Sequence, residues 1–195
     1  LRGRAGTAHG PVHWTGNFDE IQDFENDIRL RFGGSGFMAD ADFDTTRDTL
    51  GEPKAGLSEP LDALGAYVAT FDEFPRSPYR AADGSLTAEA VLGRAVFESR
   101  DCLDCHGGER LTDSGIGGLH DVGTLRPTSG MRLGEPLTGL DTPTLRGLWA
   151  SPPYLHDGSA ATIEDALRVP GHGDATSLDA TEMSQLVAFL LQLEN

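Results

Sequence analysis

The chain has 195 residues, of which 38% are hydrophobic and 24% are charged. This composition can support one large domain or two small ones and excludes a chain that is disordered throughout. The formal net charge of −16 at pH 7 disfavours nucleic acids and anionic membranes as partners, because both would repel an acidic surface. No apolar run approaches the ~20 residues that a membrane-spanning helix needs.

The first predicted helix covers residues 18–31. Asn17 and Glu20 stand three positions apart, as in the capping box that begins many helices. Apolar side chains then recur at helical spacing, at Phe18, Ile21, Phe24 and Ile28. The glycine-rich run at 33–36 ends this helix. The acidic residues 37–57, which include two glycines, are predicted to form a surface loop.

Two further helices are predicted before the middle of the chain. Ser58 is the expected N-cap of the first, and Pro60 is tolerated in its first turn. Its apolar stripe consists of Leu61, Leu64, Tyr67, Val68 and Phe71. Pro75 and Pro78 end it and begin a connector to about residue 84. The next helix starts at Thr87 and carries Val91, Leu92, Ala95, Val96 and Phe97.

The second half of the chain begins with residues 107–143, which are rich in Gly, Thr and Pro and predict long loops. Thr162 and Asp165 then bracket the start of a short helix with Ile163, Ala166 and Leu167. Asp179 caps the last helix, whose apolar stripe consists of Met183, Leu186, Val187, Leu190 and Leu191. Because only helices are predicted, the fold class is all-α.

The run Cys102-Leu103-Asp104-Cys105-His106 contains both cysteines of the chain. Two thiols three positions apart, followed directly by an imidazole, are typical of a c-type haem attachment site. Both sulfurs can form thioethers with one porphyrin, and His106 then lies under the iron as an axial ligand. We therefore predict one covalent haem c on Cys102, Cys105 and His106. A porphyrin would also give the long loops of residues 107–143 a surface to wrap.

Two other kinds of site use the same two thiols. A redox dithiol would need a thioredoxin-like βαβ surround, which the sequence pattern does not show. A zinc site would need two more ligands, and these would have to be distant histidines because no other cysteine exists. Haem is the favoured interpretation, because the five-residue pattern uses both cysteines of the chain. A helix before the motif and an amphipathic helix closing the chain also match the cytochrome c arrangement.

The sequence also contains an apparent internal repeat. The segment from Leu1-Arg2-Gly3 through Trp14-Thr15-Gly16 to Asp23 is similar to the segment from Leu145-Arg146-Gly147 through His156-Asp157-Gly158 to Asp165. If this is a true repeat, residues 1–79 match only the part of the second unit that lies after its haem motif. The first unit's attachment site would then lie before Leu1 or have been lost. Coincidence among glycine-rich turns is the alternative.

Three blocks, at 102–108, 141–148 and 153–167, carry a family resemblance that is strongest over 85–195. In these residues the chain resembles the bacterial dihaem cytochrome c peroxidases and the related methylamine-utilisation haem enzyme. The resemblance implies a cytochrome c domain over 81–195, preceded at 1–80 by a helical segment like the later half of a first cytochrome domain. In that family the second haem donates electrons and has a Met ligand, while the first haem carries the peroxide chemistry.

The chain departs from this family pattern in two ways. It has a single haem motif, so the peroxidatic centre is not expected in it. Where the family's Met would fall it has Pro170, which cannot bind iron, and His172 follows between two glycines. We predict His172 as the sixth iron ligand, with Met131 as the alternative. The remaining candidates are His156, His120, His9, His13 and Met183, of which Met183 is expected in the core and His120 in a loop hydrogen bond.

Other residues are expected around the haem. Arg126, Arg146 and Trp149 are predicted to donate hydrogen bonds to its carboxylates, because buried carboxylates need donors; ordinary surface or core roles are the alternative. The resemblance places His156 near the haem without binding iron. It also implies a structural Ca²⁺ between domains in the block containing Thr142 and Thr144, held by backbone oxygens and water.

Together these features predict an exported c-type cytochrome that exchanges electrons with another redox protein or an upstream haem domain. Covalent haem implies a periplasmic or extracellular location, and Leu1 in place of an initiator Met is expected for a mature or trimmed chain. One alternative is the electron-relay part of a dihaem peroxidase-like or oxidase-like enzyme. Another is a small domain that uses haem only as a structural staple. Whether the chain is itself an enzyme stays open.

Overall fold

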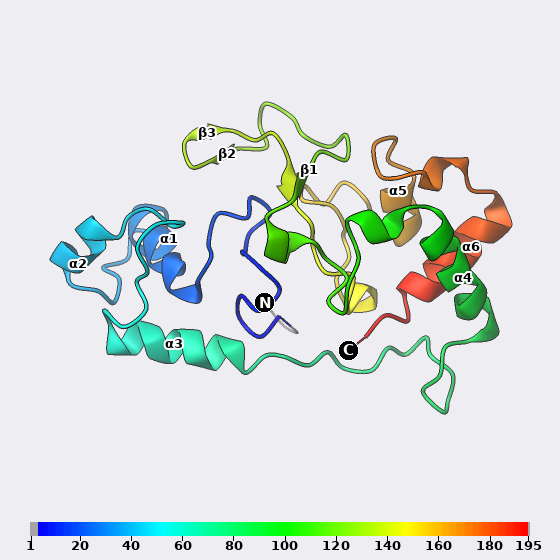
Figure 1. The fold of residues 1–195 in the computed structure, drawn as a ribbon, viewed down its shortest axis with the longest axis horizontal. Helices are drawn as coiled ribbons and strands as arrows, with labels where there is room; N and C mark the ends of the chain where they lie inside the picture. Colours follow the sequence, from blue (N-terminus) through cyan, green and yellow to red (C-terminus); the bar gives the residue numbers. More distant parts are fainter. Residues whose placement is uncertain (1–3, 195) are drawn as a thin grey trace.

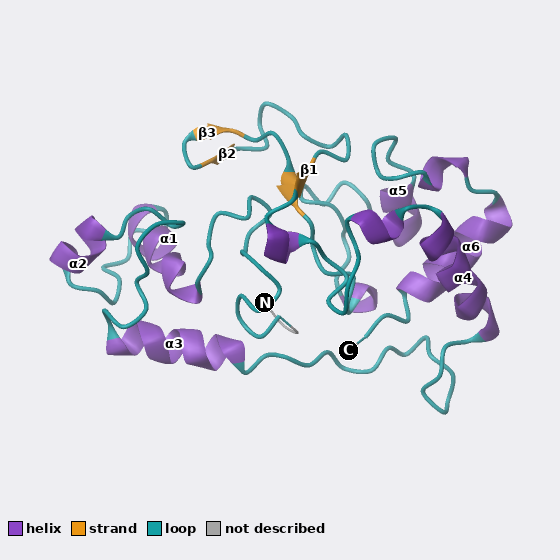
Figure 2. Ribbon diagram, in the orientation of Figure 1, coloured by secondary structure: helices purple, strands orange, loops and turns teal. Residues whose placement is uncertain are grey.

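The computed structural model describes residues 4–194. The molecule is elongated, with one group of helices at each end and a layer of loops between them (Figures 1 and 2). One end holds α1 (Phe24–Leu30), α2 (Asp40–Thr45) and α3 (Glu59–Ala69). The other holds α4 (Ala88–Ser99), α5 (Ile163–Leu167) and α6 (Ala180–Leu190). The largely helical character predicted from the sequence is confirmed.

The loop layer contains short elements that the sequence pattern did not predict. Two antiparallel pairs of two-residue strands lie there: β1 (Leu119–His120) with β4 (Leu140–Asp141), and β2 (Met131–Arg132) with β3 (Glu135–Pro136). Single 3₁₀ turns occur at η1 (Ile21–Asp23), η2 (Cys102–Asp104), η3 (Ser114–Ile116), η4 (Leu148–Ala150) and η5 (Ala175–Ser177). An alternation of two residues is too short to be recognised as a strand, so a strictly all-α description needs this correction.

The main core lies where α4 packs against α6. Thr87 caps α4 by accepting the Ala90 N–H, and Asp179 caps α6 as predicted. Gly93 stands at the crossing of the two helices, where a Cβ atom would lie 1.8 Å from the carbonyl oxygen of Gln185. Glycine therefore allows the close approach. The buried face of α4 is Ala90, Gly93 and Phe97, whereas the predicted stripe residues Val91 and Leu92 are exposed.

The first helix begins later than the predicted residue 18. Residues Ile21–Asp23 form η1, and only then does α1 begin. The capping box is made by Glu20 and Asp23, not by Asn17 and Glu20. Phe18 precedes the helix. Its backbone pairs with Val12 in an antiparallel bridge, and its side chain is buried.

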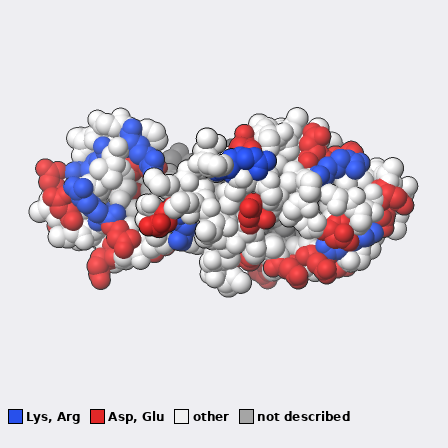
Figure 3. All heavy atoms as spheres, turned by 90° about the horizontal axis from the view of Figure 1, so that it is seen from above, with Lys and Arg blue, Asp and Glu red and all other residues white. Residues whose placement is uncertain are grey.

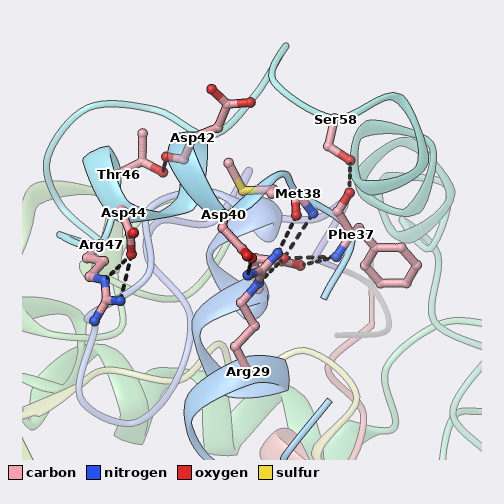
Figure 4. A network of polar contacts seen from close by, with 10 residues as sticks. Arg29, Phe37, Met38, Asp40, Asp42, Asp44, Thr46, Arg47 and Ser58 are labelled. Atoms are coloured by element: carbon pink, nitrogen blue, oxygen red, sulfur yellow. Dashed lines mark hydrogen bonds and ion pairs between the residues drawn. The ribbon is translucent and has the colours of Figure 1, made fainter. Parts of the chain in front are cut away.

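The predicted surface loop at 37–57 instead contains α2 and is tied to α1 by a buried carboxylate. Glu25, which is fully buried, accepts the backbone N–H groups of Phe37 and Met38 and the Nε–H of Arg29. Arg29 also pairs with Asp40 at 2.7 Å and donates to the Met38 carbonyl (Figure 4). Ser58 precedes α3 as predicted, but its hydroxyl donates to the Phe37 carbonyl and does not cap the helix.

The predicted repeat has a counterpart in the backbone. An antiparallel bridge joins Val12 to Phe18 in the first copy and Tyr154 to Ala160 in the second. Inside both bridges, equivalent positions have a positive φ: His13 and Leu155 at 70° and 68°, and Gly16 and Gly158 at 55° and 68°. Capping boxes follow in both, at Glu20 with Asp23 and at Thr162 with Asp165. Four matching features are hard to explain by coincidence; Leu1–Gly3 lie outside the described residues.

The first copy of the repeat is hydrogen-bonded to the central loop layer. The Asp141 N–H donates to the Trp14 carbonyl at 2.8 Å, and Arg132 Nε donates to the Thr15 carbonyl at 2.8 Å. The connector between α3 and α4 runs along one side and is held near the C-terminus by an Arg80–Glu194 ion pair of 2.8 Å (Figure 1). Residues far apart in sequence thus form one continuous structure.

Charged side chains of both signs occur near each end of the face shown in Figure 3. Among the described residues, no helix combines the length and apolar character needed to cross a bilayer.

Candidate haem site

The two thiols lie on a tight turn that directly follows α4. Asp101 adopts a left-handed conformation with φ of 55°, and η2 then begins at Cys102. The His106 N–H donates to the Cys102 carbonyl at 2.9 Å, which closes one turn over the motif. Both cysteines are free and partly buried. Burial raises the pKa of both thiols, whereas an activated redox dithiol needs a lowered pKa. The site is therefore better suited to a covalent attachment than to thiol–disulfide exchange.

The imidazole of His106 is prepared to act as a ligand through one nitrogen. Its Nδ1 lies 3.3 Å from the carbonyl oxygen of Leu111, an acceptor for an Nδ1–H. Burial, followed by repulsion from His172, lowers the pKa of His106 to about 4, so the ring is neutral at pH 7. A neutral ring with its proton on Nδ1 keeps the Nε2 electron pair for a metal.

The imidazole of His172 has the same arrangement. Its Nδ1 lies 2.9 Å from the carbonyl oxygen of Ala166, at the end of α5. The centroids of the His106 and His172 rings are 6.4 Å apart. Metal–imidazole bonds are about 2 Å long, so two rings bound to opposite sides of one metal ion have centroids roughly 6 Å apart. The residues present therefore fit a haem iron held between two histidines.

The other predicted ligand candidates lie elsewhere. Met131 is on β2 with 63% of its surface exposed, and Met183 is 2% exposed in the α4–α6 core, where it was predicted to pack. The ring of His13 packs against Phe18 and Phe24. His9 is buried, and its Nε2 lies 3.3 Å from Arg146 Nη1. The structure thus brings only His172, among these candidates, to a ring contact with His106.

His156 is held by hydrogen bonds within the loop layer. Its Nε2 lies 3.1 Å from the Ser129 hydroxyl, and its Nδ1 lies 3.4 Å from the Thr124 hydroxyl. The Trp14 ring is 6.4 Å away, centroid to centroid. Both ring nitrogens have partners, so His156 is placed as a hydrogen-bonding residue in this structure.

The three predicted donors to the haem carboxylates differ in their contacts. Arg126 donates to the carbonyls of Gly123 and Leu125 in its own loop, and Arg146 stacks on the Phe74 ring at 5.4 Å. The indole Nε1 of Trp149 is buried and has no hydrogen-bond partner among the described residues. Among the three predicted residues, Trp149 therefore has an N–H that can donate a hydrogen bond to a further group.

The residues predicted near a Ca²⁺ site are engaged in other hydrogen bonds. The Thr142 carbonyl accepts from the Thr112 hydroxyl at 2.6 Å, and the Thr144 hydroxyl donates to the Arg110 carbonyl at 2.7 Å. The calcium site stays a prediction.

One pair beside the haem motif was missed from the sequence. His120 Nε2 lies 2.6 Å from Asp113 Oδ2, and both are close to the Cys105 sulfur. The prediction of a hydrogen-bonded His120 was correct, but nothing in the spacing of these residues revealed the partner or the neighbouring thiol.

Comparison with known proteins identifies the family. A family profile described as RoxA-like, cytochrome c-like, matches residues 139–170. The gamma subunit of hydrazine synthase from Kuenenia stuttgartiensis is 34% identical in an alignment of 172 residues that covers 68% of this chain and 48% of that protein. Cytochrome c551 peroxidase from Nitrosomonas europaea is 28% identical, over 68% of this chain and 44% of that protein.

The methylamine utilization protein MauG from Methylorubrum extorquens is 32% identical over 57% of this chain and 36% of that protein. The chain is related to the bacterial dihaem cytochrome c peroxidase family. It spans about half the length, or less, of these relatives.

Solved structures extend the likeness to nearly the whole chain. A structure of Kuenenia stuttgartiensis hydrazine synthase under xenon superimposes on 98% of this chain and 70% of its own, with a TM-score of 0.67 and 27% identity. A MauG-like protein associated with microbial copper homeostasis superimposes on 72% of this chain and 58% of its own, with a TM-score of 0.52 and 23% identity. The second likeness concerns the fold alone. The cytochrome c-like character predicted from the motif is confirmed by the family profile that matches residues 139–170.

Proposed function

We propose that the chain carries one covalent haem c and transfers electrons as an exported cytochrome c-type domain. Cys102 and Cys105 would attach the haem, and His106 and His172 would bind its iron from opposite sides. The observation that carries the proposal is the 6.4 Å separation of the two imidazoles, each held through Nδ1 by a backbone carbonyl. Once bound, the haem supplies an iron that changes oxidation state reversibly.

Ligation of the haem iron by two histidine nitrogens would affect both its reactivity with peroxide and its reduction potential. An iron bound by both His106 and His172 would have no ligand position left for peroxide, which favours electron transfer over peroxide chemistry. Imidazole in place of a thioether also lowers the reduction potential, because a Met ligand raises it. The electron partner would be another redox protein or an upstream haem domain.

Further residues of the chain support the same proposal. Trp149 has a buried N–H that lacks an acceptor among the described residues, and a haem carboxylate would supply one. Arg126 and Arg146 remain proposed donors of the same kind. We divide the chain into a helical segment at 1–80 and the haem domain at 81–195. Covalent haem attachment would place the protein in the periplasm or outside the cell.

The direct test is a spectrum of the purified protein, with a pyridine haemochrome assay and an intact mass. We expect a Soret band, a low-spin spectrum, two thioether bonds and the mass of the polypeptide plus one haem. A mass equal to the polypeptide alone, with no Soret absorbance, would refute the proposal. A haem that shows no reversible reduction would instead support a purely structural role.

A second candidate function is the electron-relay part of a peroxidase-like enzyme. The observation that favours it is the likeness to cytochrome c551 peroxidase, of which this chain spans 44%. The repeat in the backbone points the same way, because residues 12–23 match residues 154–165, which lie after the haem motif of the second unit. Peroxide turnover with a reduced donor, by the chain together with its redox partner, would support this function. Electron transfer without turnover would favour the first.

A further inference from the structure

We propose that Asp113, held in place by His120, is a redox-tuning residue whose negative charge beside the haem attachment motif stabilises the oxidised iron. This inference rests on the proposed haem of Cys102, Cys105 and His106. It assigns a role to a residue that neither attaches the haem nor binds its iron.

The first support is proximity to the attachment motif. The Cys105 sulfur, a carboxylate oxygen of Asp113 and a ring nitrogen of His120 all lie within 4.8 Å of one another. A thioether at Cys105 would place the porphyrin edge at this same sulfur. The carboxylate would therefore lie next to the haem without touching the iron.

The second support is that the pair is fixed by separate elements of the loop layer. Asp113 directly precedes η3, and the Ser114 N–H behind it donates to the Thr112 hydroxyl at 3.0 Å. His120 lies on β1, which is paired with β4. The 2.6 Å contact between His120 Nε2 and Asp113 Oδ2 joins the two segments, so the carboxylate has little freedom to turn away from Cys105.

The third support is the charge state. The Asp113 side chain is only 11% exposed, and its burial opposes ionisation. Hydrogen bonds from Thr142 and His120 outweigh burial and hold the pKa of Asp113 below its usual value, so the group is ionised at neutral pH. A charge buried in this way is screened far less by salt than a surface charge.

The direction of the effect follows from the charges. Oxidised iron carries one more positive charge than reduced iron, so a nearby carboxylate favours the oxidised form. At a separation of about 10 Å and an effective dielectric constant of about 20, one unit charge changes the equilibrium constant for reduction by about tenfold. The same three side chains could bind a metal in a haem-free chain, but a sulfur already bonded to haem has lost the thiolate that zinc prefers.

The test is the midpoint potential of the holoprotein by spectroelectrochemistry. Asp113→Asn should make reduction easier, with an equilibrium constant about tenfold higher, while Asp113→Glu should stay close to the unmodified protein because it keeps the charge. Glu109→Gln is the matched control, since it removes one negative charge from an exposed position near the same motif. Its potential should change much less.

Each outcome decides one question. An unchanged potential in Asp113→Asn, with haem incorporation and spectrum intact, would overturn the inference and leave the proposed function standing. Absence of haem in the unmodified protein would refute the proposed function itself. Asp113→Ser also removes the charge and serves if the Asn variant fails to incorporate haem. If neither neutral variant incorporates haem and Asp113→Glu does, Asp113 is needed for folding and the inference is overturned.

Discussion

The imidazoles of His106 and His172 face each other at 6.4 Å although they come from different halves of the domain. His172 reaches this place through a loop that leaves α5 and closely approaches the central loop layer. Gly171 is needed there, because a Cβ atom would lie 2.6 Å from the Val122 carbonyl carbon. The glycine that precedes His172 is therefore a packing requirement of the site.

Replacement of His172 by alanine should abolish the low-spin spectrum. The iron would lose one of its two nitrogen ligands and become high-spin or bind water. Absorption and electron paramagnetic resonance spectra of the oxidised protein measure this directly. Met131→Ala is the matched control, because Met131 is 63% exposed on β2 and should leave the spectrum unchanged. The reverse pattern would identify Met131 as the ligand.

Gly93→Ala should destabilise the protein by about 2 kcal/mol or more, although alanine is the better helix former. The added methyl group would meet the Gln185 carbonyl oxygen and force α4 away from α6. Urea denaturation followed by circular dichroism measures the loss. Gly115→Ala is the control, since the nearest atom to its Cβ would be the His9 carbonyl oxygen at 3.8 Å. Equal stability of the two variants would contradict the close helix contact.

The buried Asp141 should make the protein less stable as the pH rises. Burial raises the pKa of Asp141 to about 6, above its value of 3.8 in the unfolded chain, against a hydrogen bond from Ser114 and the attraction of Arg4. The folded state thus holds the proton more tightly, and this group's contribution is lost as the pH rises from about 4 to above 6.

Asp141→Asn should consequently stabilise the protein at pH 8 by on the order of 2 kcal/mol and have little effect near pH 4. Urea midpoints at several pH values test this, with Asp44→Asn as an exposed control. A pH dependence that is identical in the Asp141 variant and the parent would show that this carboxyl is not responsible.

The contribution of the buried Lys54–Asp23 ion pair to stability can be tested with a single and a double variant. Its atoms Nζ and Oδ1 are 2.6 Å apart, and both side chains are almost fully buried. Lys54→Met leaves a buried carboxylate unpaired and should cost about 3–5 kcal/mol. The double variant Asp23→Asn, Lys54→Met should recover part of that loss. Thermal unfolding measures both. A Lys54→Met cost below about 1 kcal/mol would mean that Asp23 finds another partner or a proton.

Local signals in the sequence were reliable where the interaction itself is local. Thr162 with Asp165 and Asp179 with Glu182 form capping boxes in the structure because the partners are three residues apart. Ser58 is also a favoured N-cap residue, yet its hydroxyl donates to the Phe37 carbonyl, which only the tertiary fold brings close. Helix α2 was missed because, of its six residues, only Phe43 is buried, too little for an apolar period.

The same distinction applies to the candidate site. Cys102, Cys105 and His106 are contiguous, so their pattern could be recognised directly. His172 was inferred from the position of a missing Met in the family, and the structure places it against His106. The Asp113–His120 pair depends on the pairing of β1 with β4, whose two-residue strands leave no periodic signal. Only the three-dimensional fold brings these two residues together.

The pairing of α4 with α6 has a consequence for how the protein matures. The cysteines directly follow α4, but the helix that completes the core against α4 is made from residues 180–190. A chain that emerges from a translocation channel N-terminus first exposes its thiols well before residues 180–190 are available. In the exported cytochrome proposed above, an enzyme that attaches haem would therefore reach the motif before α6 packs against α4.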